Sequence, residues 1–199
     1  LHYIFRITHP AGLIVIFFFM CLFASLTAHH RMYLGKIGFA IAFFSITLSS
    51  AIVLTSMMFF RIISMRPNEI IPLGGMIIGN SLNIYTLTID RLKGEVKNTI
   101  DLIESRIALG ATLKEALKLP SRAAIKAAFI PILNSLQTVG IIHIPGITTG
   151  MILAGAPPLR AVSYQIAIMY MLVSVALFTG YFSILLASRR SIFGGIIEG

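Results

Sequence analysis

The chain has 199 residues, of which 57% are hydrophobic and 12% charged, with a net charge of +9. A mean hydropathy of +0.91 lies outside the range of soluble globular domains and predicts a protein embedded in a membrane. The basic residues stand between apolar stretches, which argues against nucleic acid as a partner, and one cysteine excludes an internal disulfide.

Five segments are long and apolar enough to cross a bilayer as helices, because the hydrocarbon core needs about twenty apolar residues. In chain order they are 10–28, 37–60, 72–89, 123–143 and 162–187. The third and fourth carry many Gly, amide and hydroxyl residues, so they must face protein or water and not lipid. The Gly- and Pro-rich stretch 145–158 is expected to be irregular or re-entrant. Since the chain starts without Met beside a span, we expect membrane helices to be missing before Leu1.

The distribution of Lys and Arg predicts the orientation. The loop 29–36, the segment 91–126 and the tail after 188 hold twelve of the sixteen basic residues, leaving Arg6, Arg61, Arg66 and Arg160 on the other side. The positive-inside rule makes the first group cytoplasmic. We therefore expect an all-α, multi-pass protein of the cell (inner) membrane, with a single permease-like domain over 1–199 and a cytoplasmic C-terminus.

A charged segment, 91–120, separates the third and fourth spans. Apolar residues recur in it at spacings of four and three, which predicts one face of a helix: Leu92, Val96, Ile100, Ile103 and Ile107. Gly110 is placed to end this helix as its C′ residue. Thr112 and Glu115 form a capping box for a second short helix, which we expect to end before Pro120, with Ser121 capping the next helix.

This segment has two interpretations from its residues alone. It is either an amphipathic connector lying on lipid headgroups or a docking element for another protein. Five acids between Asp90 and Glu115 weaken the lipid interpretation and favour a protein groove.

The residues Glu104-Ser-Arg-Ile-Ala-Leu-Gly-Ala-Thr112 resemble the Glu-Ala-Ala…Gly signature of ABC-transporter permeases, a loop that inserts into the ATPase subunit. Glu104 and Gly110 keep the spacing, while Ser105 and Arg106 replace the two alanines. With Ile71-Pro-Leu-Gly-Gly-Met-Ile-Ile-Gly-Asn-Ser81 and Ile144-Pro-Gly-Ile-Thr-Thr-Gly150, the chain resembles the FetB-type permeases, a family of bacterial iron exporters and plant aluminium-tolerance permeases.

The resemblance implies a permease subunit that exports a metal ion or metal complex. It also implies two partners, a second copy of the permease and a separate ABC ATPase that binds ATP and Mg²⁺. This chain has no Walker A glycine loop, so we expect no enzymatic activity and no cofactor in it. The residues expected to couple it to the ATPase are Glu104, Ala108, Leu109, Gly110, Ala111 and Thr112, where small side chains allow close approach of two backbones.

Amides and hydroxyls at membrane depth are candidates for a translocation path: Asn80, Asn83, Asn134, Gln137 and Thr138. An unpaired polar group there costs several kcal/mol, so each must meet cargo, water or another helix, and interhelical hydrogen bonding is the alternative role. The five histidines have no metal-ligand spacing, so no metal site is expected, and the iron assignment rests on the resemblance.

Two other function classes stay open. An ion-gradient-driven carrier would need a carboxylate inside a span, and the interiors of the predicted spans have none. A non-transporting membrane scaffold would explain a protein-binding segment but would give the amides no purpose.

Overall fold

The computed structural model describes residues 10–187, apart from 33, 35–36, 65 and 141–143. Its four long apolar helices are α1 (Pro10–Arg31), α2 (Gly38–Phe59), α3 (Pro67–Asn98) and α8 (Pro158–Ala187). The others are α4 (Ile100–Ala108), α5 (Leu113–Ala116), α6 (Lys118–Thr138) and α7 (Gly146–Leu153). The prediction of an all-α polytopic membrane protein is confirmed.

Four helices in the described residues are long and apolar enough to cross a membrane, namely α1, α2, α3 and α8. They match the first, second, third and fifth predicted spans. The predicted fourth span, 123–143, corresponds to the 21-residue helix α6, which is not among the four because Lys118, Arg122 and Lys126 lower its hydropathy. This helix starts five residues earlier than predicted and ends at Thr138, and His143 lies outside the described residues.

The longest helix, α3, continues from the third span into the charged segment without a break. Pro67 opens it at a position where the missing N–H costs nothing. Its 32 residues extend over about 48 Å, more than the hydrocarbon core of about 30 Å, so one end projects beyond the bilayer. The predicted boundary near Ile89 is wrong, because buried Leu92 and Val96 extend the packed face and the lone Gly94 does not stop a helix.

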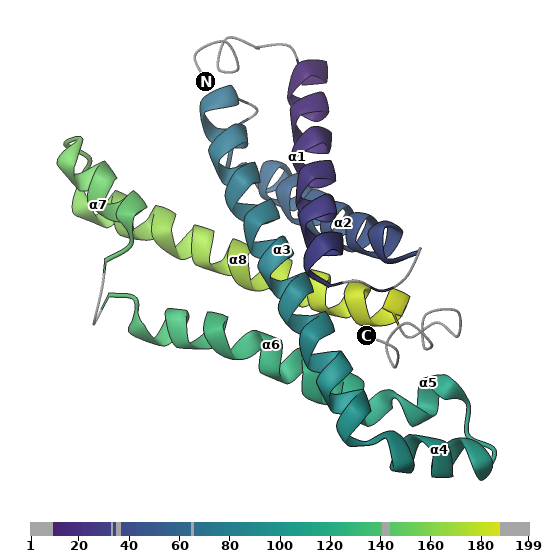
Figure 1. Ribbon diagram of the computed structural model, residues 1–199. Coiled ribbons are helices and arrows are strands. Elements are labelled where there is room, and N and C mark those ends of the chain that lie inside the picture. The colour runs from purple at the N-terminus through teal and green to yellow at the C-terminus, as the bar shows by residue number, and fades with distance from the viewer. Residues whose placement is uncertain (1–9, 33, 35–36, 65, 141–143, 188–199) are drawn as a thin grey trace.

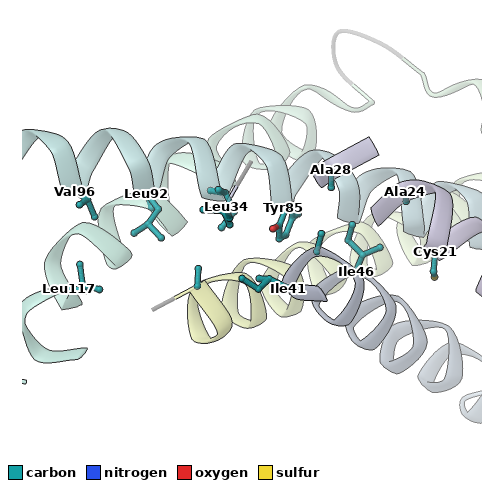
Figure 2. Packing of buried hydrophobic residues seen from close by; sticks show 14 of the residues in the cluster. Cys21, Ala24, Ala28, Leu34, Ile41, Ile46, Tyr85, Leu92, Val96 and Leu117 are labelled. Atoms are coloured by element: carbon teal, nitrogen blue, oxygen red, sulfur yellow. The ribbon is translucent and has the colours of Figure 1, made fainter. Parts of the chain in front are cut away.

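Helix α3 crosses the whole molecule, and α1, α2, α6 and α8 pack along it (Figure 1). Two clusters of buried apolar side chains hold these helices together. One contains Tyr85 and Leu92 of α3 and Ile41 of α2 (Figure 2). The other contains Ile77 of α3 and Val175 of α8. The clusters lie toward opposite ends of α3, so the bundle is fixed along most of its length.

Between the two clusters, α2, α3 and α8 meet through hydroxyl groups, which we call the hydroxyl seam: Ser49, Ser50, Ser81 and Thr179. All four side chains are fully buried. Thr179 Oγ1 lies 2.7 Å from Ser49 Oγ and 3.2 Å from Ser81 Oγ, and Ser50 Oγ lies 3.1 Å from Ser81 Oγ. Small hydroxyl side chains allow close helix packing in a bilayer and supply hydrogen bonds across it.

Candidate functional site

The connection from α3 to α6, residues 99–117, is called the elbow from here on. Its first turn is at Gly110, which has a φ of 93°, a conformation that favours glycine. The Gly110 N–H donates to the Ile107 carbonyl at 2.9 Å, and the Ala111 N–H donates to the Arg106 carbonyl at 3.0 Å. This is the Schellman pattern of a helix C-terminus, so the predicted role of Gly110 as C′ residue is confirmed.

The second turn of the elbow is the predicted capping box, which is also confirmed. The Thr112 N–H and hydroxyl donate to Oε2 of Glu115 at 2.9 and 2.7 Å, and the Glu115 N–H donates to Thr112 Oγ1 at 3.4 Å. These hydrogen bonds from Thr112 hold the pKa of the Glu115 carboxyl below its ordinary value of 4.5, and the charge of Lys118 contributes less. Hydrogen bonds therefore fix the chain on both sides of Ala111.

The apolar stripe predicted for a single helix is divided between two. Thr99 has a φ of −121° and separates α3 from α4, while its Oγ1 donates to the Glu95 carbonyl at 2.7 Å. A threonine hydroxyl that bonds the preceding turn bends a helix readily. The far end of the stripe is only partly packed, as the 42% exposure of the Ile107 side chain shows.

The start of α6 also differs from the prediction. This helix begins at Lys118, so Pro120 lies in its first turn, where a missing N–H is tolerated. Ser121 was expected to cap this helix, but it lies inside α6 and is buried. Ser121 is buried because the face of α6 that packs against neighbouring helices already begins at Pro120 and Ser121.

The elbow is anchored at its base and exposed at its tip. Ile103 and Leu117 are each 1% exposed and belong to the cluster that contains Leu92 of α3. At the tip, Leu109 is 89% exposed, and the other predicted coupling residues are exposed or, for Ala111, half-buried: Glu104, Ala108, Gly110, Ala111 and Thr112. The tip projects at the C-terminal end of α3, away from α7 (Figure 1). An apolar side chain held out on an anchored turn is suited to enter a pocket of another protein.

The structure separates the five predicted path residues into two groups. Asn80 is half-buried and its Nδ2 donates to the Leu172 carbonyl of α8 at 3.2 Å, and Thr138 Oγ1 donates to the Asn134 carbonyl at 3.0 Å. The first hydrogen bond therefore joins α3 to α8, and the second lies within α6. The side chains of Asn83, Asn134 and Gln137 are exposed and have no hydrogen-bond partner among residues 10–187 as described.

A polar cavity that the sequence did not reveal lies at the end of the molecule away from the elbow. It measures about 640 Å³, and its lining includes Glu69 of α3 and Arg160 and Tyr164 of α8. The Ser64 N–H donates to Glu69 Oε2 at 2.7 Å. One signal could have indicated it, since Glu69 is the only acid before residue 90. In the described part of the chain, no three His, Cys, Asp or Glu side chains lie together to hold a metal ion; His2, His9 and His143 lie outside that part.

Comparison with known proteins finds matches that cover nearly the whole chain. Residues 1–193 match the model of an uncharacterised protein family, UPF0014. Over 88% of the chain, the sequence is 33% identical to Protein ALUMINUM SENSITIVE 3 of Arabidopsis thaliana. The identity is 34% to the Probable iron export permease protein FetB of Escherichia coli (strain K12) and 32% to the UPF0014 membrane protein STAR2 of Oryza sativa subsp. japonica. The matched part covers 64%, 68% and 62% of these relatives, respectively. No solved structure matches the chain.

Proposed function

The chain belongs to the UPF0014 family of membrane proteins, and we propose that it is the permease subunit of an ABC transporter that exports a metal ion or metal complex. The observation that carries the proposal is the elbow, with an exposed tip at Leu109 and a base buried at Ile103 and Leu117. The relative named as a probable iron export permease supports transport as the function and iron as the cargo class. ATP hydrolysis, with its Mg²⁺, takes place in a separate ATPase subunit.

Coupling in this proposal depends on the rigid connection between the elbow and the spans. The ATPase subunit holds the tip formed by 108–112, and Glu104 pairs with a basic residue of its groove. Because Leu117 and Ile103 pack in the same cluster as Leu92 and Val96 of α3, displacement of the tip moves α3 as well. One helix without a break, Pro67–Asn98, carries that displacement across the bilayer.

The path for the cargo lies between two copies of the chain in this proposal. Asn83, Asn134 and Gln137 are exposed and point away from the bundle core, and in this proposal the polar surface of a single chain forms one part of a larger path. Amide oxygens can exchange with the hydration water of a metal ion or can bond a chelating ligand. The polar cavity at Glu69 lies at the opposite end from the elbow and is suited to be the exit.

The test is reconstitution of the permease with its ATPase in liposomes, with ATP-dependent metal flux as the measurement. We expect Glu104→Lys to reduce flux to background, because a like charge then faces the basic groove, while the protein stays folded, since Glu104 is exposed. Asp90→Lys makes the same charge change at an exposed position of α3 and is the control. Normal flux in Glu104→Lys would remove the assigned role of the elbow, and flux driven by an ion gradient without ATP would indicate a carrier.

A further inference from the structure

Helix α6 has a basic face made of Lys118, Arg122 and Lys126, and all three side chains are exposed. At four-residue spacing they fall within about 80° of arc and along about 12 Å of the helix axis. The side of α6 that packs against its neighbours is the opposite one: Pro120, Ser121, Ala124 and Ala128. The basic face therefore points outward from the bundle.

Helix α6 itself supplies no counter-charge to this face. Helix α6 contains no Asp or Glu, and none of the three cations forms a hydrogen bond or ion pair with another described residue. Glu115 is close enough for the charge of Lys118 to lower its pKa, so its carboxylate offsets part of the charge at this end of the face. Arg122 and Lys126 therefore have no paired acid among the described residues, and the face keeps a net positive charge.

The basic face lies where the apolar parts of α3 and α6 give way to charged residues. A Cβ on Gly180 of α8 would lie 3.7 Å from the Phe129 ring of α6 and 3.9 Å from Thr88 Oγ1 of α3, so the three helices meet close to these residues. Toward the elbow, the first charged residue on α3 is Asp90, two residues after Thr88. The first on α6 is Lys126, three residues before Phe129. The headgroup layer is about 5 to 7 Å deep on each side of the hydrocarbon core, so the basic face extends through it.

Apolar side chains accompany the three cations. Leu119 and Ile130 are 49% and 54% exposed on the same outward side of α6. Lys and Arg with exposed apolar neighbours are typical of the boundary between acyl chains and headgroups, where the alkyl stems contact lipid and the charged ends reach phosphate.

We propose that Lys118, Arg122 and Lys126 bind the phosphate headgroups of anionic phospholipids in the leaflet on the elbow side. Charge complementarity selects anionic over zwitterionic lipid. The bound headgroups hold α6 at a fixed depth and thereby fix the base of the elbow relative to the bilayer. This inference does not depend on the proposed transport function.

Native mass spectrometry of the purified protein with a mixture of phosphatidylglycerol and phosphatidylcholine tests the proposal. The unaltered protein should retain phosphatidylglycerol preferentially, and each single variant, such as Arg122→Gln, should lose about fivefold in that preference. The triple variant Lys118→Gln, Arg122→Gln, Lys126→Gln should lose most of it. The matched control removes three other exposed cations near the elbow, as Arg91→Gln, Lys97→Gln, Lys114→Gln, and should keep the preference.

Three outcomes would overturn the proposal. The first is a triple variant that keeps the original preference, and the second is a control that loses as much as the triple variant, which would show a general charge effect. The third is displacement of phosphatidylglycerol by millimolar inorganic phosphate, which would assign the face to a soluble anion. The single variants keep the test valid should the triple variant fail to fold.

Discussion

Replacing Leu109 with alanine tests whether the tip of the elbow enters a pocket of an ATPase subunit. The change removes three carbon atoms from a side chain that is 89% exposed in the isolated chain. If docking buries it, each carbon is worth about 0.8 kcal/mol, so the loss of binding free energy is about 2 kcal/mol. This corresponds to an affinity about 30-fold lower. In the unbound permease the same change should alter stability by less than about 0.5 kcal/mol, because the side chain contacts little.

The control for Leu109→Ala is Leu153→Ala. Leu153 is 83% exposed at the end of α7, on the part of the molecule away from the elbow (Figure 1). The same atoms are thus removed from a similarly exposed site that lies away from an ATPase docked at the elbow. Affinity is measured by surface plasmon resonance, with the permease in lipid nanodiscs and the ATPase subunit in solution, and melting temperature is recorded for both variants. Equal affinities of the two variants would refute the reasoning, because Leu109 would then contribute no more than any exposed leucine.

Three further predictions concern stability and pH. Gly38→Ala should destabilise the protein by about 1 to 3 kcal/mol and lower its melting temperature, because the new Cβ would lie 3.0 Å from Leu34 Cβ, whereas Gly79→Ala meets nothing within 4 Å and should not destabilise. Thr179→Val removes two contacts of the hydroxyl seam and should cost about 1 kcal/mol in reversible unfolding. The lowered pKa of Glu115 means that its capping bonds stabilise the elbow fully above pH 4.5 and are lost as the pH falls through the lowered value. The protection factors of the α5 amides, which are exchange rates corrected for the intrinsic effect of pH, should therefore fall there, and Glu115→Gln should remove this change in protection.

Each of these predictions has an outcome that contradicts it. A melting temperature that is unchanged in Gly38→Ala would mean that Leu34 moves away from the new Cβ at no cost. A Thr149→Val control, in an exposed part of α7, that loses as much stability as Thr179→Val would show that the seam is not special. A protection factor that falls equally with pH in Glu115→Gln would locate the titrating group elsewhere.

Local signals predicted the turns of the elbow, because each depends on only a few adjacent residues. Gly110 and the Thr112–Glu115 box are such cases, since a left-handed C′ position and a capping box are both fixed by residues within one helical turn. The apolar spans were also evident, because length and hydropathy decide membrane insertion. The residues predicted to couple to an ATPase are exposed for a related reason, since a turn at the tip of the elbow brings its side chains to the surface.

The register of the helices was not predictable, because it depends on packing between distant segments. Ser121 looks like a cap and Pro120 looks like a stop, yet α6 begins before both, since its buried side fits against α3. Asn80 and Asn83 are three residues apart and read alike in the sequence. Only the position of α8 shows that Asn80 bonds the Leu172 carbonyl while Asn83 stays exposed.

The depth of the exposed amides argues that a single chain does not face lipid on all sides. Gln137 lies 11 residues from Lys126 and Asn83 lies 7 from Asp90, so they are at most about 16 and 10 Å inward from the first charges, measured along the helix axes, within a core about 30 Å thick. An amide without a hydrogen bond costs about 2 kcal/mol or more in an apolar medium. With Asn134, three such groups would cost about 6 kcal/mol, which is comparable to the whole stability of a typical domain. Water or further protein must therefore contact this surface, and the proposed path between two permease subunits would provide both.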